Sequence, residues 1–431
     1  MKKSIALAFA ATAGAAAFAA PVVSDVTMSQ DGSRTVTINY TLSGGEPGIV
    51  TVDIQTNRGD GVWVSIGGKH LTYFAGDANK LVQPGSRTIT WKPRKAWPDN
   101  EVTENVKAVV SAWATNAPPD YMVVSLAAAK SVNYYTCAEN VPFGVENDMY
   151  KTEYLVMRKI PAANVQWRMG SPTTENPRNA TREVPHLVTL GEDYYIGVYE
   201  VTQRQWELLM NNRPSQFTTD YATRPVEYVS YEAIRGKAKD GYDWPNDGHD
   251  VCNTNFVGVL RKLTGMNGFD LPTEAQWEFA CRAGCGSMLY NGTELESNWS
   301  SVRSANLSPI ARYSLGGGKV LNAQGSWVNP DYTVGPANGG TAKVGSLEAN
   351  AWGLYDMLGN VFELCLDWYQ DDVSSMTSDP KGPKTGSYRV YRGGGWYINA
   401  NNCRCAFRGG DITPSQVNHG GGFRLAYFIG Q

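Results

Sequence analysis

The last forty residues of the chain decide the fold. They read Tyr388-Arg-Val-Tyr-Arg-Gly-Gly-Gly-Trp396, then Asn402-Cys-Arg-Cys-Ala-Phe-Arg408, and finally Gly422-Phe-Arg-Leu-Ala426. A β-rich start leads into a glycine cluster and a polar loop. An arginine-bearing strand follows, and a long Gly/Asn/Ser loop connects it to a last strand. This order predicts two loops held on a rigid frame, which is where binding and catalytic residues commonly lie.

The composition of the whole chain limits the class of protein. A length of 431 residues predicts two or three domains. With 42% hydrophobic residues, only 18% charged residues and 45 glycines, the composition indicates a compact, loop-rich protein that contains β-structure. The formal net charge of −3 and the lack of any run of Lys or Arg argue against nucleic-acid or anionic-membrane binding.

Residues 1–19 have the pattern of a secretory signal peptide. Lys2 and Lys3 provide the positive start, residues 5–16 form an Ala-rich apolar stretch, and Ala17-Phe18-Ala19 fits the small-x-small pattern that precedes cleavage. The apolar stretch is too short for a membrane span, and no other segment qualifies. We therefore expect an exported protein, periplasmic or extracellular, without a membrane span.

Residues 20–130 have the pattern of an antiparallel β-sandwich of the immunoglobulin or fibronectin type. Apolar and polar residues alternate, or β-formers gather, in short runs at 36–42, 50–54, 62–66, 88–91 and 106–113. Short strands at regular spacing with turn residues between them are typical of such sandwiches. We interpret residues 131–148 as a linker.

Residues 149–431 predict an irregular α+β domain. Thr202 and Gln205 have the spacing of a helix capping box, and Thr273 and Gln276 repeat it, so a short helix is predicted after each threonine. The rest of this region is rich in Gly, Asn and Trp and shows only short strands. Its loops must therefore be held by disulfides, aromatic packing or ions.

Three further stretches of this region join the C-terminal ones quoted above: Tyr195-Ile-Gly-Val-Tyr-Glu-Val-Thr202, Leu271-Pro-Thr-Glu-Ala-Gln-Trp-Glu278 and Gly353-Leu-Tyr-Asp-Met-Leu-Gly-Asn-Val361. Together they resemble the formylglycine-generating, sulfatase-modifying-factor family, which implies a C-type-lectin-like α+β domain with little regular secondary structure. Family members include copper-dependent oxidases that convert a sulfatase cysteine to formylglycine. Related domains occur beside iron-dependent sulfoxide synthases, on kinases, and as hypervariable ligand-binding proteins of diversity-generating retroelements. The fold alone does not choose among these functions.

The resemblance to the oxidases breaks down at their copper site. Those enzymes carry a Gly-Gly-Ser-Tyr turn followed by two cysteines, and both thiolates bind copper. Here Gly395 replaces the serine and Ile398 replaces the first cysteine, while Cys403 matches the second only when counted forward from the turn. One copper thiolate is missing by this count. These departures argue against copper and oxidase activity, and they leave Cys403 as the candidate for any catalytic thiol.

The seven cysteines all lie beyond residue 136, and in an exported protein they are expected to form disulfides. The resemblance implies a bridge between Cys281 and Cys405, and it leaves Cys365 to pair with Cys403. The odd count leaves at least one thiol outside any such framework.

The resemblance also implies structural calcium. Asn360, Val361 and Glu363 match one family site, and Asn306 matches part of a second site whose later ligands fit only loosely. Oxygen ligands of these kinds suit Ca²⁺. The alternative is a buried hydrogen-bond network of the Asn and Glu side chains.

The two C-terminal loops are the predicted binding surface, because they combine aromatic side chains with amides as protein- and sugar-recognition surfaces do. The candidate binding residues are Trp396, Tyr397, Asn399, Asn401, Asn402, Asp411, Gln416, Asn418 and His419. The alternative is ordinary hydrophilic loop composition. Arg404, Arg408 and Arg424 are expected to form internal ion pairs.

Three functions remain open from the sequence. The leading hypothesis is an exported, non-copper member of the family, a pseudoenzyme that binds a protein or carbohydrate ligand through these loops. The second is an oxidase that installs formylglycine on exported sulfatases. The third is a ligand-binding receptor diversified by a retroelement.

Overall fold

The computed structural model describes residues 19–127, 131–245, 249–297, 300, 302–333, 335 and 338–430. The predicted signal peptide therefore lies outside the described residues, apart from its last position. The chain divides into two compact units. The first consists of Met1–Ser65 and Tyr73–Pro118, and the second of Ile66–Thr72 and Pro119–Gln431.

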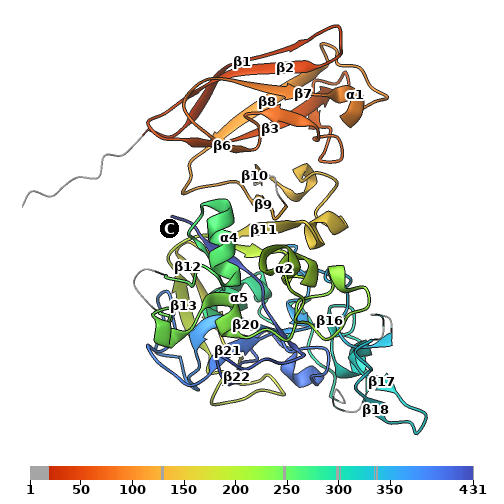
Figure 1. Cartoon of the computed structure of the whole chain (residues 1–431), viewed down its shortest axis with the longest axis vertical. Helices are drawn as coiled ribbons and strands as arrows, with labels where there is room; N and C mark the ends of the chain where they lie inside the picture. Colours follow the sequence, from red (N-terminus) through yellow and green to blue (C-terminus); the bar gives the residue numbers. More distant parts are fainter. Residues whose placement is uncertain are drawn as a thin grey trace, which may run out of the picture. The chain divides into compact units, whose positions relative to one another are not determined.

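The first unit contains two antiparallel sheets, drawn in red and orange in Figure 1. One sheet has the order β1 (Val22–Gln30), β2 (Val36–Ser43), β7 (Gly85–Trp91), β5 (Phe74–Gly76). In the other, β3 (Gly48–Asn57) pairs with β8 (Val106–Trp113), β4 (Trp63–Ser65) and β6 (Lys80–Val82). A short helix, α1 (Pro93–Ala96), follows β7. The alternation read from the sequence is present, because Val36, Ile38, Tyr40 and Leu42 of β2 are all buried while the residues between them are not.

The chain divides earlier than the sequence predicted. We placed the end of the sandwich at residue 130 and a linker at 131–148, but β9 (Tyr121–Ser125) and β10 (Val132–Tyr135) belong to the second unit. There β9 pairs with β11 (Tyr154–Ile160). All five residues of β9 are buried, the pattern of a strand covered on both faces rather than of a sandwich edge.

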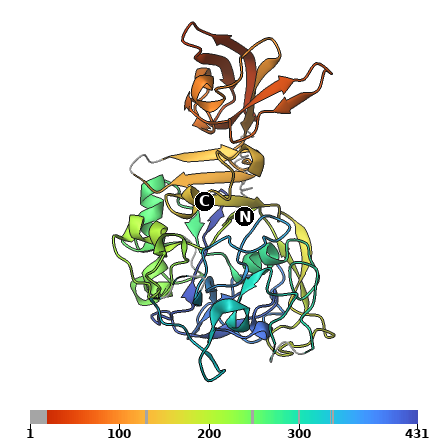
Figure 2. The same ribbon diagram turned by 90° about the vertical axis from the view of Figure 1, so that its right-hand side faces the viewer.

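A six-stranded sheet brings distant segments of the second unit together. Its order is β10, β9, β11, β14 (Tyr194–Gly197), β24 (Ala426–Phe428), β15 (Phe269–Asp270). The C-terminal strand β24 thus lies between β14 and β15, where the blue end of the chain enters the sheet in Figure 2. The same unit contains the helices α2 (Gln203–Met210), α3 (Tyr231–Arg235), α4 (Phe256–Thr264) and α5 (Glu274–Arg282).

Both predicted capping boxes are confirmed. Thr202 Oγ accepts a hydrogen bond from the Gln205 N–H at 3.2 Å, and the Thr202 N–H donates to the Gln205 side chain at 3.0 Å. Thr273 and Gln276 repeat the exchange at 3.2 and 2.9 Å, so α2 and α5 begin where the sequence indicates. Helix α4 was not predicted, and its N-cap residue Asn255 makes no side-chain cap bond.

A second sheet forms the frame of the C-terminal loops. Its order is β22 (Gly409–Ile412), β21 (Arg389–Arg392), β20 (Phe362–Trp368), β23 (Gly421–Gly422). The glycine cluster follows β21, and Gly394 has a φ of +74°, which favours glycine. A side chain there would also collide with Cys403, since a Cβ would lie 2.5 Å from its sulfur.

The remaining elements of the second unit are short and joined by long irregular segments. The strand pairs are β12 (Val165–Met169) with β13 (His186–Leu190), β16 (Ala311–Arg312) with β19 (Leu358–Gly359), and β17 (Val320–Leu321) with β18 (Trp327–Val328). Single turns of helix are η1 (Ala138–Asn140), η2 (Asp148–Lys151), η3 (Tyr221–Thr223), η4 (Ala238–Asp240), η5 (Ser314–Gly318) and η7 (Ala400–Asn402). This texture is the irregular α+β domain that the sequence predicted. Within the ranges that the structure describes, we find no helix with the length and apolar character of a membrane span.

Candidate functional site

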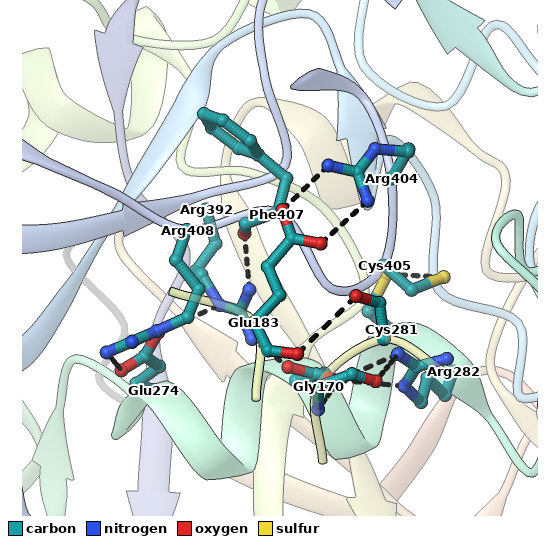
Figure 3. A network of polar contacts seen from close by, with 12 residues as sticks. Gly170, Glu183, Glu274, Cys281, Arg282, Arg392, Arg404, Cys405, Phe407 and Arg408 are labelled. Atoms are coloured by element: carbon teal, nitrogen blue, oxygen red, sulfur yellow. Dashed lines mark hydrogen bonds and ion pairs between the residues drawn. The ribbon is translucent and has the colours of Figure 1, made fainter. Parts of the chain in front are cut away.

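Three buried arginines anchor the C-terminal loops to the rest of the second unit. Arg404 contacts Glu175 and Glu183 at 2.6 and 2.7 Å. Arg408 contacts Glu274, and Arg424 binds both carboxylate oxygens of Glu363. Figure 3 shows the first two arginines directed at carboxylates from other segments. The prediction that these arginines form internal pairs is confirmed, so their charges stabilise the frame and are not free for a ligand.

The same network continues into helix α5. Glu278 accepts hydrogen bonds from Arg282 at 2.8 Å and from Arg392 of β21. Burial alone would raise the pKa of Glu278, but Arg392 and Arg282 hold it below its ordinary value. The carboxylate therefore stays ionised and fixes β21, from which the first C-terminal loop begins.

Cys403, the candidate catalytic thiol, lies inside this frame. Its side chain has no exposed surface, and its sulfur packs against Gly394. Burial raises the pKa of the Cys403 thiol to about 12. Because the thiolate is the form that binds copper and attacks substrates, a thiol of this kind is inert at neutral pH.

All seven cysteines are free thiols in the structure, so neither predicted disulfide is formed. The sulfurs of Cys281 and Cys405 lie side by side, 3.7 Å apart. Cys365 lies in β20. Burial raises the pKa of its thiol, and the charges of Asp367 and Glu274 raise it further, whereas at Cys403 the charge of Arg404 opposes the rise that burial causes. Cys365 and Cys403 are both free and buried, so their predicted bridge is not formed in this structure and stays a prediction, while Cys281 and Cys405 are adjacent as the resemblance implied.

The residues expected to bind calcium are occupied by other partners. Asn360 accepts a hydrogen bond from the Ala342 N–H at 2.7 Å and donates one to Glu200 at 2.6 Å. The Val361 N–H also donates to Glu200. Glu363 receives Arg424 on both oxygens. This is the hydrogen-bond network that we considered as the alternative, and its donor set does not fit a calcium ion.

The second expected calcium position fits no better. Asn306 donates to the backbone oxygen of Glu294, and its own N–H donates to Glu296. Asp331, which follows the later ligand pattern of that family site only loosely, accepts a hydrogen bond from the Thr333 N–H in its own turn. No cluster of three or more His, Cys, Asp or Glu side chains suited to a metal occurs among the described residues.

Several predicted binding residues form an aromatic cluster, which consists of Phe217, Tyr332, Trp396, Tyr397 and His419. The ring of His419 lies 5.5 Å from that of Trp396 and 5.0 Å from that of Tyr397. Phe217 packs edge-on against Trp396 at 5.2 Å. Trp396 is fully buried, so it was wrongly predicted as a ligand contact and is a core residue of the loop. The half-buried Tyr332, Tyr397 and His419 form the accessible part of the cluster.

The predicted amides next to this cluster are used mainly in turns. Asn418 accepts hydrogen bonds from the Tyr397 hydroxyl and the Gly420 N–H. Gln416 accepts one from the Thr413 N–H at 3.4 Å. Asn399 precedes the single turn η7 and is exposed. These residues shape the loops, and Asn399 and Gln416 are the exposed ones among them.

A cavity of about 570 Å³ is lined by the other predicted binding residues, Asn401, Asn402 and Asp411. We call it the loop cavity. Residues 177–183, which include Arg178, Asn179 and Arg182, form its opposite wall. The rest of the lining consists of Tyr391, Arg404, Phe407, Arg408, Gly409 and Gly410. The part played by residues 177–183 could not be read from the sequence, because long-range contacts bring this segment to the C-terminal loops: the Arg404–Glu183 ion pair and a hydrogen bond from Arg408 to the backbone oxygen of Arg182.

A second cavity, of about 370 Å³, lies elsewhere in this unit. Trp244, His249, Asp379 and Lys381 are among the residues that line it. It contains none of the predicted site residues. The loop cavity is therefore the hollow in which the sequence prediction and the structure agree.

Comparison with known proteins defines the class. The model of the sulfatase-modifying factor enzyme 1-like domain matches residues 156–429, and the chain belongs to this family. The formylglycine-generating enzyme of Mus musculus is 33% identical over 305 residues, which cover 62% of this chain and 74% of the relative. The resemblance drawn from the sequence motifs is thus confirmed.

Other relatives carry different descriptions. Chaperone protein LppX of Paenibacillus barcinonensis is 31% identical over 236 residues, 52% of this chain and 75% of the relative. Serine/threonine-protein kinase pkn1 of Chlamydia caviae is 33% identical over 183 residues, but these are 41% of this chain and only 24% of the kinase. Among solved structures, Treponema denticola variable protein 1 is 29% identical with a TM-score of 0.45, over 64% of this chain and 95% of that one.

Proposed function

We propose that this chain is a non-copper member of the sulfatase-modifying-factor family that binds a ligand through its C-terminal loops. The observation that carries the proposal is Cys403, the cysteine that matches a copper position of the oxidases when counted forward from the glycine turn, which is buried and has a pKa of about 12. The other copper position holds Ile398, and Gly395 stands at the serine position. One buried thiol cannot supply the paired thiolates that a soft Cu(I) ion requires.

The loop cavity supports the binding part of the proposal. Asn401, Asn402 and Asp411 line it without belonging to the ion-pair network beneath. Binding sites are typically hollows with a few polar groups placed on a rigid support. The buried ion pairs of Arg404 and Arg408 provide that support here. The ligand classes that suit such loops are proteins, an exported sulfatase among them, and carbohydrates.

Titration with Cu(I) under reducing conditions tests the proposal. The wild-type chain and a Cys403→Ser variant should compete equally weakly with a Cu(I) chelator, because the wild-type thiol stays protonated and buried. Cys285→Ser is the matched control, since Cys285 lies far along the chain from the copper positions. Tight binding of one equivalent of Cu(I) that disappears only in the Cys403 variant would overturn the proposal.

We further propose that the protein is exported and cleaved before Ala20. The support is the sequence of residues 1–19, with its two lysines, apolar stretch and small-x-small end. Expression of the full chain in a bacterial host, followed by N-terminal sequencing of the protein in the envelope and culture medium, tests this. A protein that keeps residues 1–19 and stays in the cytoplasm would contradict it.

A further inference from the structure

Arg178 differs from the other arginines of the loop cavity. Its Nε donates to the Ser171 hydroxyl at 3.0 Å, and its Nη2 donates to the backbone oxygen of Glu183 at 3.3 Å. No ion pair joins it to a carboxylate among the residues that the structure describes. By contrast, Arg182 pairs with Asp371 at 3.2 Å. Arg178 thus has one edge of its guanidinium held in place and a positive charge without a partner.

The carboxylates near Arg178 do not cancel this charge. Both oxygens of Glu183 accept hydrogen bonds from Arg404. Burial raises the pKa of Glu175, although the neighbouring Arg404 opposes the shift. Asp411 is the carboxylate of the cavity wall with an oxygen available for a ligand. Its other oxygen accepts a hydrogen bond from the Tyr391 hydroxyl at 2.9 Å. The cavity wall therefore carries one available positive group and one available negative group.

Amides supply the other polar groups. The side chains of Asn401 and Asn402 make no hydrogen bond to any part of the chain that the structure describes. Asn179 uses its oxygen to accept from Thr181 and Arg182, which leaves its amino group available. Each free amide can donate to one hydroxyl and accept from another. Such groups match a ligand with several hydroxyls.

We propose that the loop cavity binds a small polyhydroxy carboxylic acid of the uronic acid type. Its carboxylate would lie against Arg178, and its hydroxyls against the asparagines and Asp411. Arg–carboxylate contacts are strong and directional because the planar guanidinium can offer two parallel N–H groups. A cavity of about 570 Å³ has room for a ligand of one or two sugar rings. This inference rests on the proposed binding function and specifies its ligand.

Titration of the full chain with matched sugars tests the inference, by saturation-transfer NMR and calorimetry. D-galacturonate, its methyl ester and D-galactose share a ring and differ in the charged group. We expect D-galacturonate to bind at least about 10-fold more tightly than the ester or galactose, the size of effect expected for one charge-assisted hydrogen bond. The ester comparison needs no variant, so it does not depend on the folding of a mutant.

Two variants locate the contact. Arg178→Gln should remove the preference for the acid and leave weak, equal binding of all three sugars. Arg213→Gln, which removes an arginine that is paired with Glu207 and does not line the loop cavity, should keep the preference. Equal binding of acid and ester by the wild type, no binding at millimolar concentration, or an unchanged preference in Arg178→Gln would each overturn the inference. None of these outcomes affects the Cu(I) titration, so failure of the ligand class and failure of the proposed function are distinguishable.

Discussion

Glu227 should make the second unit less stable as the pH rises from about 4.5 to 7. Its side chain is fully buried, and one oxygen accepts hydrogen bonds from the backbone N–H groups of Gln216 and Phe217. The other oxygen has no hydrogen-bond partner among the described residues. Burial raises the pKa of Glu227 to about 7, against the lowering effect of those N–H groups and of Arg224.

The sign and size of the effect follow from proton linkage. Between pH 4.5 and 7 the unfolded chain has already released this proton, while the folded chain still holds it. The folded state therefore loses stability as the pH rises through this window, and the loss is complete above the folded pKa. The shift of pKa from 4.5 to about 7 corresponds to a loss of roughly 3 kcal/mol in the free energy of unfolding.

Urea unfolding followed by tryptophan fluorescence between pH 4.5 and 8 measures this loss. A Glu227→Gln variant keeps an oxygen for the two N–H groups but cannot ionise, so its stability should fall by about 3 kcal/mol less over the same range. Burial raises the pKa of Asp356 to about 6 and that of Asp367 to about 7. Both groups therefore lower the stability of the wild type and of the variant by the same amount as the pH rises. They therefore cancel when the two curves are subtracted.

Glu192→Gln is the matched control, because this exposed side chain should leave the pH dependence unchanged. A stability difference between wild type and Glu227→Gln that stays constant from pH 4.5 to 8 would contradict this prediction. The result also bears on the binding surface, since Glu227 holds the backbone of Phe217, whose ring packs in the aromatic cluster.

Three further predictions concern the cysteines and the buried arginines. Cys252, whose thiol pKa is lowered by its hydrogen bond to Thr254, should react with iodoacetamide at pH 7.5 much faster than the buried Cys403, as peptide mass spectrometry would show. Mild oxidation should join Cys281 to Cys405 before any other pair, because their sulfurs lie 3.7 Å apart; a disulfide map dominated by another pair would contradict this. Arg404→Met leaves two buried glutamates without their cation and should cost about 3–5 kcal/mol in urea unfolding, whereas a cost below about 1 kcal/mol would show that the ion pair contributes little.

Local signals in the sequence were sufficient to locate helices α2 and α5 and the frame, but not helix α4. A capping box needs only residues three apart, so α2 and α5 could be located from Thr202 and Thr273. Alternation in β2 could likewise be read directly, because its period matches the pleat of a strand. The family motifs then indicated that the C-terminal arginines serve as frame residues, which their ion pairs confirm.

Features that depend on contacts between distant segments could not be predicted in this way. The boundary between the units was misplaced because β9 is continuously buried, and such a run does not show which sheet it joins. The pairing of Cys365 with Cys403 followed from elimination among family positions, and both thiols are free in the structure. Trp396 was assigned to the binding surface by its residue type, but Phe217 from another segment covers it.

The candidate site likewise has one part that local sequence signals revealed and one part that depends on contacts between distant segments. The sequence identified one wall of the loop cavity through Asn401, Asn402 and Asp411. It missed the opposite wall, including Arg178, because the contacts of that loop with the C-terminal region join residues more than two hundred positions apart in the chain. A polar loop without regular structure carries no periodic signal that would reveal such a contact.

The most direct test of the account is an assay for formylglycine formation. The purified chain is incubated with copper, oxygen, a thiol reductant and a cysteine peptide derived from a sulfatase, with the mouse formylglycine-generating enzyme as positive control. We expect the peptide to keep its cysteine, because the Cys403 thiol is buried and protonated. Conversion of the peptide cysteine to an aldehyde by the wild type, and not by Cys403→Ser, would contradict it.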